Sequence, residues 1–289
     1  MSVLFSFPEQ KPLAEKLYGE TIKPGLWEWR HFPDKESYVR LTSNVKNGPV
    51  IILCSLNNPD EKFLPLAFLA ETLKELGASK ITLVAPYLGY MRQDKRFKDG
   101  EAVTSTLFAR QLSPFIDRIV TIDPHLHRRK NLEEIYSCAC TVLSAETLMA
   151  TWIKSTLPNP LLVGPDMESE QWVKTVAQEV KAPYIILEKT RRDDHEVDIH
   201  LPDISRYKGL KPLLLDDIIS TGTTMIKTIG LIRQSGFSDI SCLATHAVFA
   251  ENAYENLQRS GAKIIATTNT IPHASNALEI SSLLKDCLA

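Results

Sequence analysis

The sequence predicts an α/β protein made of two domains, each with a parallel β-sheet covered by helices. Runs of apolar and β-branched residues alternate with segments whose apolar residues recur at helical spacing, which is the βαβ pattern. This alternation runs through the chain twice. The 289 residues also suit two domains, at roughly 150 residues each. We place the boundary between Leu143 and Pro158, and assign residues 1–147 and 148–289 to the two domains.

The first half opens its α/β pattern with an apolar strand at Pro49–Leu56. A helix is expected over Glu61–Leu76, because apolar residues recur there at helical spacing and Gly77 follows. The next elements expected are a strand at Lys80–Ala85, a helix at Thr104–Leu112 and a strand at Arg118–Ile122.

The second half restarts the pattern with a short strand at Leu161–Val163. A polar stretch, Glu188–Arg206, has no predicted element. The other elements expected are helices at Glu168–Val180 and Thr223–Ser235, strands at Tyr184–Leu187, Lys211–Leu215, Ile240–Ala247 and Ile264–Thr268, and a last helix from about Ala277.

Composition excludes several classes of protein. Lysine and arginine total 33 and aspartate and glutamate total 35, so the net charge of −2 does not favour binding to nucleic acid or anionic membranes. Every apolar run is shorter than the roughly 18 residues of a membrane helix. The start of the chain lacks the pattern of a secretory signal. Because the five cysteines are odd in number and scattered, we expect free thiols and a cytoplasmic protein.

The sharpest motif is Leu213–Thr224, where an apolar strand leads into two acids, a glycine-containing turn and a helix. Ligands of open α/β sheets bind at the carboxyl ends of strands, and a helix N-terminus offers N–H groups to an anion. Hydroxyl donors follow at Ser220, Thr221, Thr223 and Thr224. Asp216 and Asp217 would repel a phosphate, and they suit a sugar diol or a metal held by phosphates. A phosphate beside a diol indicates a phosphorylated pentose. In the alternative interpretation, Ser220 or Thr221 only caps the helix and the two acids are only solvated. That interpretation gives no reason for the adjacent acid pair.

The segment Asp216–Thr224 resembles the phosphoribosyl pyrophosphate loop shared by phosphoribosyltransferases and phosphoribosyl pyrophosphate synthetases. A transferase normally has one such α/β domain, whereas further segments of this chain resemble ribose-phosphate pyrophosphokinase. Those segments are His31–Arg40, Pro86–Lys95, Asp123–His127, Glu188–Arg191 and Thr245–Phe249. The short chain and Phe97–Glu101 are most similar to the archaeal-type branch. The resemblance implies two phosphoribosyltransferase-like, Rossmann-like domains, with ATP on the N-terminal one and ribose phosphate on the C-terminal one.

The resemblance also implies roles for individual residues. Nucleotide contacts would fall on Phe32, Asp34 and Glu36 toward a neighbouring subunit, and on Arg92, Gln93 and Asp94. The metal residues would be His125 and Asp166, with Mg²⁺ as cofactor, and the catalytic cations would be Lys189 and Arg191 on a mobile loop. Ribose phosphate would be held by Asp216, Asp217, Ser220, Thr221, Gly222, Thr223 and Thr224. A homo-oligomer, dimer or hexamer, is implied as well.

The reaction expected is transfer of the β,γ-diphosphoryl group of ATP to the C1 hydroxyl of ribose 5-phosphate, giving phosphoribosyl pyrophosphate and AMP. Such a transfer requires a neutralised polyanion and an aligned donor and acceptor. Mg²⁺ needs few protein ligands beside phosphate oxygens. Lys189 and Arg191 are suited to closing over the phosphates when substrate is present.

The chain departs from the family in the turn that usually has the sequence Pro-Asp-x-Gly-Gly, which here is Pro165–Ser169. Glu168 and Ser169 replace both glycines, and a carboxylate there would repel a bare phosphate. Lys35 likewise replaces a usual glycine. Three alternatives therefore stand beside the main hypothesis: the same transfer to a ribose-5-phosphate derivative such as ADP-ribose, a non-catalytic regulatory homologue, and a phosphoribosyltransferase.

Overall fold

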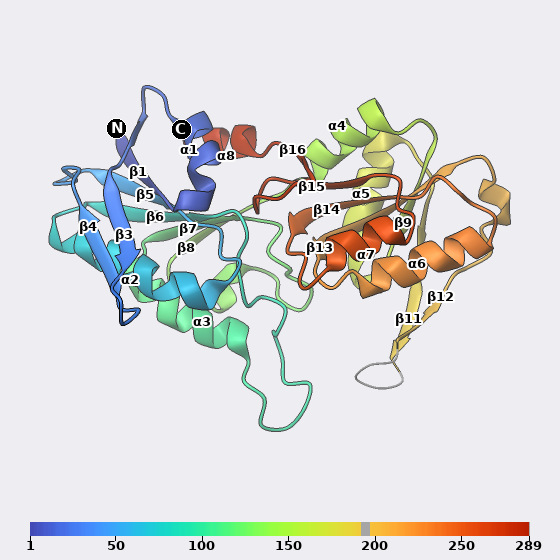
Figure 1. The fold of residues 1–289 in the computed structure, drawn as a ribbon, viewed down its shortest axis with the longest axis horizontal. Helices are drawn as coiled ribbons and strands as arrows, with labels where there is room; N and C mark the ends of the chain where they lie inside the picture. Colours follow the sequence, from blue (N-terminus) through green and yellow to red (C-terminus); the bar gives the residue numbers. More distant parts are fainter. Residues whose placement is uncertain (192–196, 289) are drawn as a thin grey trace. The chain divides into compact units, whose positions relative to one another are not determined.

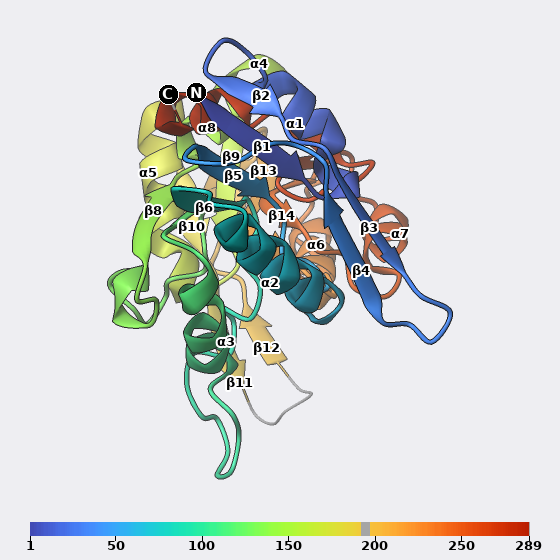
Figure 2. The same ribbon diagram turned by 90° about the vertical axis from the view of Figure 1, so that its left-hand side faces the viewer.

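The computed structural model describes residues 1–191 and 197–288. Within these ranges, the side chains of residues 189–191 and 197–198 are not described. This part of the chain forms two compact units (Figure 1). The first comprises Met1–Leu143 together with α8 (Ser281–Leu288), and the second comprises Ser144–Ile280. The domains expected from the sequence put α8 in the second half. The structure puts it in the first unit, because α8 packs against α1 (Lys11–Leu17) (Figure 2).

The first unit contains a six-stranded sheet in which every pair of neighbouring strands is parallel. Its order is β2 (Ile22–Pro24), β1 (Ser2–Ser6), β5 (Pro49–Leu53), β6 (Lys80–Ala85), β7 (Arg118–Ile122) and β8 (Ala139–Leu143). The central strands β5 and β6 are apolar and buried almost throughout, as in a parallel sheet covered on both faces.

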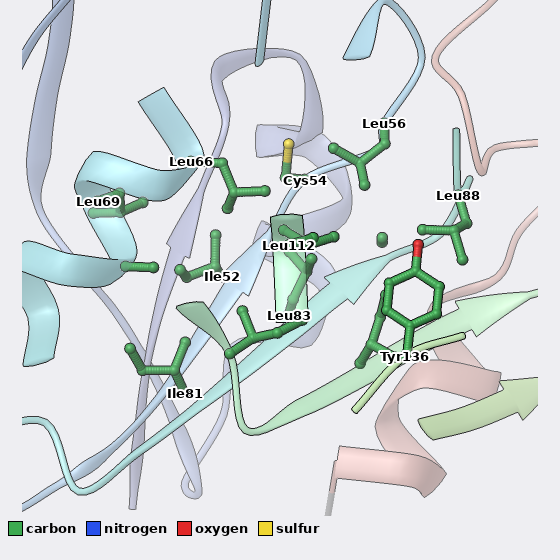
Figure 3. Close-up of a cluster of buried hydrophobic side chains, with 14 of the residues drawn as sticks. Ile52, Cys54, Leu56, Leu66, Leu69, Ile81, Leu83, Leu88, Leu112 and Tyr136 are labelled. Atoms are coloured by element: carbon green, nitrogen blue, oxygen red, sulfur yellow. The ribbon is translucent and has the colours of Figure 1, made fainter. Parts of the chain in front are cut away.

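Helices and one hairpin complete this unit. The helices besides α1 and α8 are α2 (Pro59–Glu75) and α3 (Thr104–Leu112), with short 3₁₀ turns η1 (Pro8–Gln10), η2 (Ser113–Phe115) and η3 (Leu132–Glu134). Ile52 and Leu83 of the sheet belong to the same buried core as Leu66 of α2 and Leu112 of α3 (Figure 3). The antiparallel hairpin β3 (Trp27–His31) and β4 (Ser37–Leu41) runs beside α2 (Figure 2).

The second unit repeats this plan with a second six-stranded parallel sheet. Its order is β10 (Tyr184–Ile186), β9 (Pro160–Gly164), β13 (Lys211–Ile219), β14 (Ser241–Ala247), β15 (Ile265–Thr268) and β16 (Asn276–Leu278). One buried cluster contains residues of α6 (Thr223–Gln234) and α7 (Ala253–Arg259), and another contains residues of α4 (Glu146–Thr156) and α5 (Glu170–Val180). Short turns η4 (Met167–Ser169) and η5 (Ser205–Tyr207) and a hairpin of β11 (Glu188–Arg191) and β12 (Val197–His200) complete the unit.

The predicted α/β class with parallel sheets and covering helices is confirmed. Two local expectations were wrong. The last helix begins at Ser281, because Asn276–Leu278 pairs with β15 as an edge strand. The polar stretch Glu188–Arg206 holds β11 and β12. Within the described ranges, no helix combines the length and the apolar character needed to cross a membrane.

Candidate active site

The acid pair of the second unit lies where the strand order of its sheet reverses. The chain passes from β9 to β10 on one side, and the later strand β13 lies on the other side of β9. Such a switch point, at the carboxyl ends of the strands, is the usual ligand position in an open α/β sheet. Asp216 and Asp217 lie near the carboxyl end of β13, and Asp166 follows β9. The structure therefore brings Asp166, Asp216 and Asp217 to one edge of the sheet.

The turn after β13 leaves the start of α6 open to a ligand. Gly222 has φ of 70°, and a Cβ there would also lie 3.4 Å from Leu257, so the position requires glycine. No side-chain cap of α6 is found in the described part of the chain. Thr223 donates a hydrogen bond to Thr221 Oγ1 (3.1 Å), and both threonines are exposed. The first-turn N–H groups of α6 and these hydroxyls form an anion-binding turn.

Electrostatics at this edge favours a cation. Burial raises the pKa of Asp216 well above its ordinary value, and the neighbouring Asp217 and Asp166 raise it further. The backbone N–H of Asp217 donates to Asp216 Oδ1 at 2.9 Å, which opposes that rise only in part. A hard divalent cation prefers carboxylate oxygens and would relieve this repulsion. The carboxylates of Asp166, Asp216 and Asp217 are therefore suitable ligands for Mg²⁺.

The divergent turn Pro165–Ser169 folds without any left-handed residue. Ser169 donates its N–H to Asp166 Oδ1 (3.3 Å) and its Oγ–H to Asp166 O (2.7 Å), and its side chain is buried. Its φ is −84°, which any residue adopts. Glu168 is exposed next to this cap. The turn thus accommodates its two replacements of glycine, with Asp166 capping η4 and Ser169 as the residue that donates to Asp166.

In the first unit, the segment with Arg92, Gln93 and Asp94 is held by the loop that follows β7. Arg128 Nη1 lies 3.1 Å from Asp94 Oδ1, and Arg129 Nη2 donates to Asp94 O at 3.3 Å. Gln93 Oε1 accepts a hydrogen bond from Thr104 of α3 (3.1 Å), and Arg92 is exposed. The sequence analysis missed Arg128 and Arg129. Their position directly after His127 was the available signal.

His125 lies in that same loop, in a strained backbone. Its φ is 47° and that of Asp123 is 39°, which is unusual for residues other than glycine. His125 Nδ1 and His127 Nε2 are 3.0 Å apart, so a proton on one nitrogen is donated to the other. His127 thereby fixes the orientation of His125. Asp166, the other predicted metal residue, belongs to the second unit.

Phe32, Asp34 and Glu36 lie in the turn of the β3–β4 hairpin. Phe32 N–H donates to Glu36 O (2.8 Å), and Asp34 Oδ1 accepts from Glu36 N–H (3.2 Å). Lys35, which replaces a usual glycine, has φ of 73°, so the turn keeps the left-handed conformation that favours glycine. Phe32 is 40% exposed. The turn therefore presents an aromatic ring and two carboxylates to the surroundings.

Lys189 and Arg191 both lie on β11, where Lys189 pairs with Ile199 and Arg191 with Val197. Their side chains are outside the described part of the structure. The backbone places the two predicted cations on one strand, two residues apart.

Known proteins match the chain over nearly its whole length. Residues 2–114 match the family model of the N-terminal domain of ribose phosphate pyrophosphokinase, and residues 132–281 match that of the phosphoribosyl transferase domain. Ribose-phosphate pyrophosphokinase of Sulfurisphaera tokodaii is 37% identical over 85% of this chain and 84% of its own. The chain belongs to the ribose-phosphate pyrophosphokinase family.

Further relatives extend the match within the ribose-phosphate pyrophosphokinase family. The protein of that name from Methanosarcina acetivorans is 34% identical over 96% of this chain and 97% of its own. The crystal structure of phosphoribosylpyrophosphate synthetase from Mycobacterium smegmatis has a TM-score of 0.87 at 26% identity, covering 99% of this chain and 97% of its own. The resemblance found in the sequence motifs, including that to archaeal members, is confirmed.

Proposed function

We propose that this protein is an ATP-dependent ribose-phosphate diphosphokinase. It transfers the β,γ-diphosphoryl group of ATP to the C1 hydroxyl of ribose 5-phosphate, with phosphoribosyl pyrophosphate and AMP as products. The observation that carries this proposal is the acid pair Asp216 and Asp217 followed by the uncapped start of α6, at the switch point of the second sheet. Relatives named ribose-phosphate pyrophosphokinase across nearly the full chain support it.

In the second unit, the turn from Ser220 to Thr224 binds the 5-phosphate. Its exposed hydroxyls and the first N–H groups of α6 donate to phosphate oxygens. Asp216 and Asp217 accept hydrogen bonds from the ribose hydroxyls, which carry no charge and so are not repelled. The turn and the acid pair together orient C1 toward the incoming diphosphoryl group, and this positioning supplies much of the rate enhancement.

Mg²⁺ is the metal we propose, with Asp166 and His125 among the residues that hold it. When bound, the metal neutralises phosphate oxygens of the nucleotide and of the transferred group. Asp166 contributes a hard oxygen ligand, and His125 contributes a ring nitrogen whose orientation is fixed by His127.

The nucleotide is assigned to the first unit. Arg92, Gln93 and Asp94 contact ATP there, and the Phe32 turn reaches ATP of a neighbouring subunit in a homo-oligomer, either dimer or hexamer. Lys189 and Arg191 bring positive charge to the transferred diphosphoryl group as its charge develops. For location we propose the cytoplasm, on the basis of the odd and scattered cysteines.

The test incubates the protein with Mg²⁺, ATP and ribose 5-phosphate and quantifies both products. AMP and phosphoribosyl pyrophosphate are expected in equal amounts. Lys189→Ala should lower kcat on the order of 10³-fold while ATP still binds. Lys208→Ala, at an exposed lysine elsewhere in the second unit, is the matched control and should keep full activity. ATP binding without AMP from any acceptor would instead indicate a regulatory homologue.

A second candidate function is the same transfer to a ribose-5-phosphate derivative, and exposed Glu168 beside Asp166 favours it. A carboxylate there repels the free phosphate group of ribose 5-phosphate. It tolerates better the phosphate of a derivative such as ADP-ribose, in which that phosphate is linked to another group. AMP formation with ADP-ribose but not with ribose 5-phosphate would establish this candidate. Glu168→Gly should then increase the use of ribose 5-phosphate, whereas no change would assign Glu168 no part in acceptor choice.

A further inference from the structure

The two faces of the β3–β4 hairpin differ sharply in character. Successive side chains of a strand alternate between faces. Trp27 and Trp29 therefore share one face, where they pack against Phe7 at 5.2 Å between ring centroids. The opposite face bears the side chains of Glu28, Arg30 and Phe32 from β3 and its turn, and of Tyr38 and Arg40 from β4. This second face carries charges and aromatic rings, although it does not contribute to the core.

On that face the guanidinium of Arg30 packs against the rings of Phe32 and Tyr38, and these three side chains form a corner. Its guanidinium carbon lies 4.8 Å from the ring centroid of Phe32 and 4.2 Å from that of Tyr38. The two rings meet edge to face, 5.7 Å apart at 81°. Arg30 and Tyr38 are directly opposite each other in the strand pairing. A guanidinium plane over an aromatic ring is an attractive arrangement, so Arg30 holds both rings in place.

Several contacts limit the movement of this corner. Arg30 Nε donates to Glu28 Oε1 at 3.2 Å, two residues back on the same face. Lys35 N–H donates to Phe32 O (2.9 Å), which closes the turn beside the ring. Arg30 and Glu28 are each nearly half exposed, at 47% and 48%. An exposed ring held by neighbours binds a flat partner with less loss of side-chain freedom than a mobile ring does.

We propose that Arg30 is a positioning residue that holds the Phe32 ring, with Tyr38 as a second wall, for stacking against the base of ATP. The inference rests on the proposed function, and it adds two residues for which the family resemblance implied no role. Aromatic rings and arginine side chains are the usual platforms for nucleobases, because every base has a flat π-face. The corner leaves part of the Phe32 ring exposed for such contact.

The experiment measures the dissociation constant for ATP by calorimetry, together with kcat and the KM of each substrate. Arg30→Ala should raise both the Kd and the KM for ATP about fivefold, the equivalent of an exposed cation–π contact of about 1 kcal/mol. The KM for ribose 5-phosphate should stay within about twofold. Tyr38→Ala should behave like Arg30→Ala, and Tyr38→Phe, which keeps the ring, should restore affinity for ATP.

Arg40→Ala is the matched control, because Arg40 is an exposed arginine on the same face, opposite Glu28. It should leave the Kd for ATP unchanged. The inference is overturned when Arg30→Ala and Tyr38→Ala bind ATP as the wild type does, or when Arg40→Ala weakens ATP equally, since bulk charge would then explain the effect. A wild type that binds ATP but releases no AMP overturns the proposed function alone, because the Kd comparison still decides the role of Arg30.

Discussion

The ammonium group of Lys62, on α2, lies 2.7 Å from Glu9 Oε1 and is almost completely buried. It also donates to Ser55 O (2.7 Å) and to Asn57 Oδ1 (2.8 Å). The three partners lie after β1 and β5, where the strand order of the first sheet reverses. The switch point of this sheet is therefore occupied by an internal ion pair.

Glu9→Gln should destabilise the protein by about 2–3 kcal/mol, because it leaves the Lys62 charge buried without its counter-ion. Urea unfolding measures the change. Glu71→Gln breaks the exposed pair of Glu71 with Lys74 and is the matched control, expected to cost under about 1 kcal/mol. Equal losses from the two substitutions would contradict the importance of burial.

Asp216 makes stability depend on pH. The pKa of the Asp216 carboxyl is raised in the folded protein. At pH values above the ordinary pKa of about 3.9, the unfolded chain has therefore released a proton that the folded protein still holds. Stability is therefore lost as the pH rises from that value toward the folded pKa. Asp216→Asn should be more stable than the wild type at pH 7, with a smaller advantage at pH 5. Denaturant unfolding at both values tests this, and an advantage independent of pH would refute it.

The same raised pKa predicts proton release on cation binding. A divalent cation beside Asp216, Asp217 and Asp166 favours the ionised carboxyl, so its binding should expel a proton. Calorimetric titration with Mg²⁺ in two buffers of different ionisation enthalpy measures the number of protons released. That number should fall in Asp216→Asn. Asp239→Asn, at an exposed aspartate paired with Lys263, is the control and should leave it unchanged.

Gly164 and Ser169 should be energetically coupled. A Cβ at residue 164 would lie 2.7 Å from Ser169 Oγ and 2.6 Å from Ile186 Cδ1, so Gly164→Ala should cost about 1–3 kcal/mol through overpacking. Ser169→Gly removes one of the two clashes and also the hydrogen bond from Ser169 Oγ to Asp166 O. The double variant should therefore lose less stability than the sum of the single losses. Additive losses in thermal unfolding would show that Ser169 is not the limiting neighbour.

Thiol reactivity should divide the five cysteines into two groups. Burial raises the pKa of Cys54, and it raises that of Cys242 to about 12. Both side chains are fully enclosed, so at pH 8 they should resist a thiol reagent until the protein is unfolded. At most three cysteines, namely Cys138, Cys140 and Cys287, should react in the native state, and all five in denaturant. Native modification of Cys54 in a peptide map would contradict this.

Sequence periodicity identified most strands whose two faces are both buried, although it missed β1. Lys80–Ala85 and Arg118–Ile122 were predicted to the residue, because continuous apolar runs mark the centre of a parallel sheet. The analysis missed short edge elements such as Asn276–Leu278, whose strand character comes from pairing with β15 rather than from local pattern. It also missed the β3–β4 hairpin, although Trp27–Arg30 alternates apolar and polar residues.

The motif after β13 was recognisable because its residues are contiguous in sequence and share one turn. The bracing of Asp94 by Arg128 was not, since the two residues are 34 positions apart and meet only through the packing of separate loops. The corner formed by Arg30 and Tyr38 similarly depends on strand pairing. Local sequence thus indicated which chemistry is present, and tertiary packing determined which neighbours orient it.

The two sheets share one connection plan, including the position of an extra hairpin. In each, the second strand lies at one edge beside the first, and an antiparallel hairpin is inserted before the third: β3–β4 in one, β11–β12 in the other. An internal gene duplication would produce this repetition. The hairpin of Phe32 and the hairpin of Lys189 thus occupy equivalent places in two versions of one topology, the first with aromatic residues and the second with cationic ones.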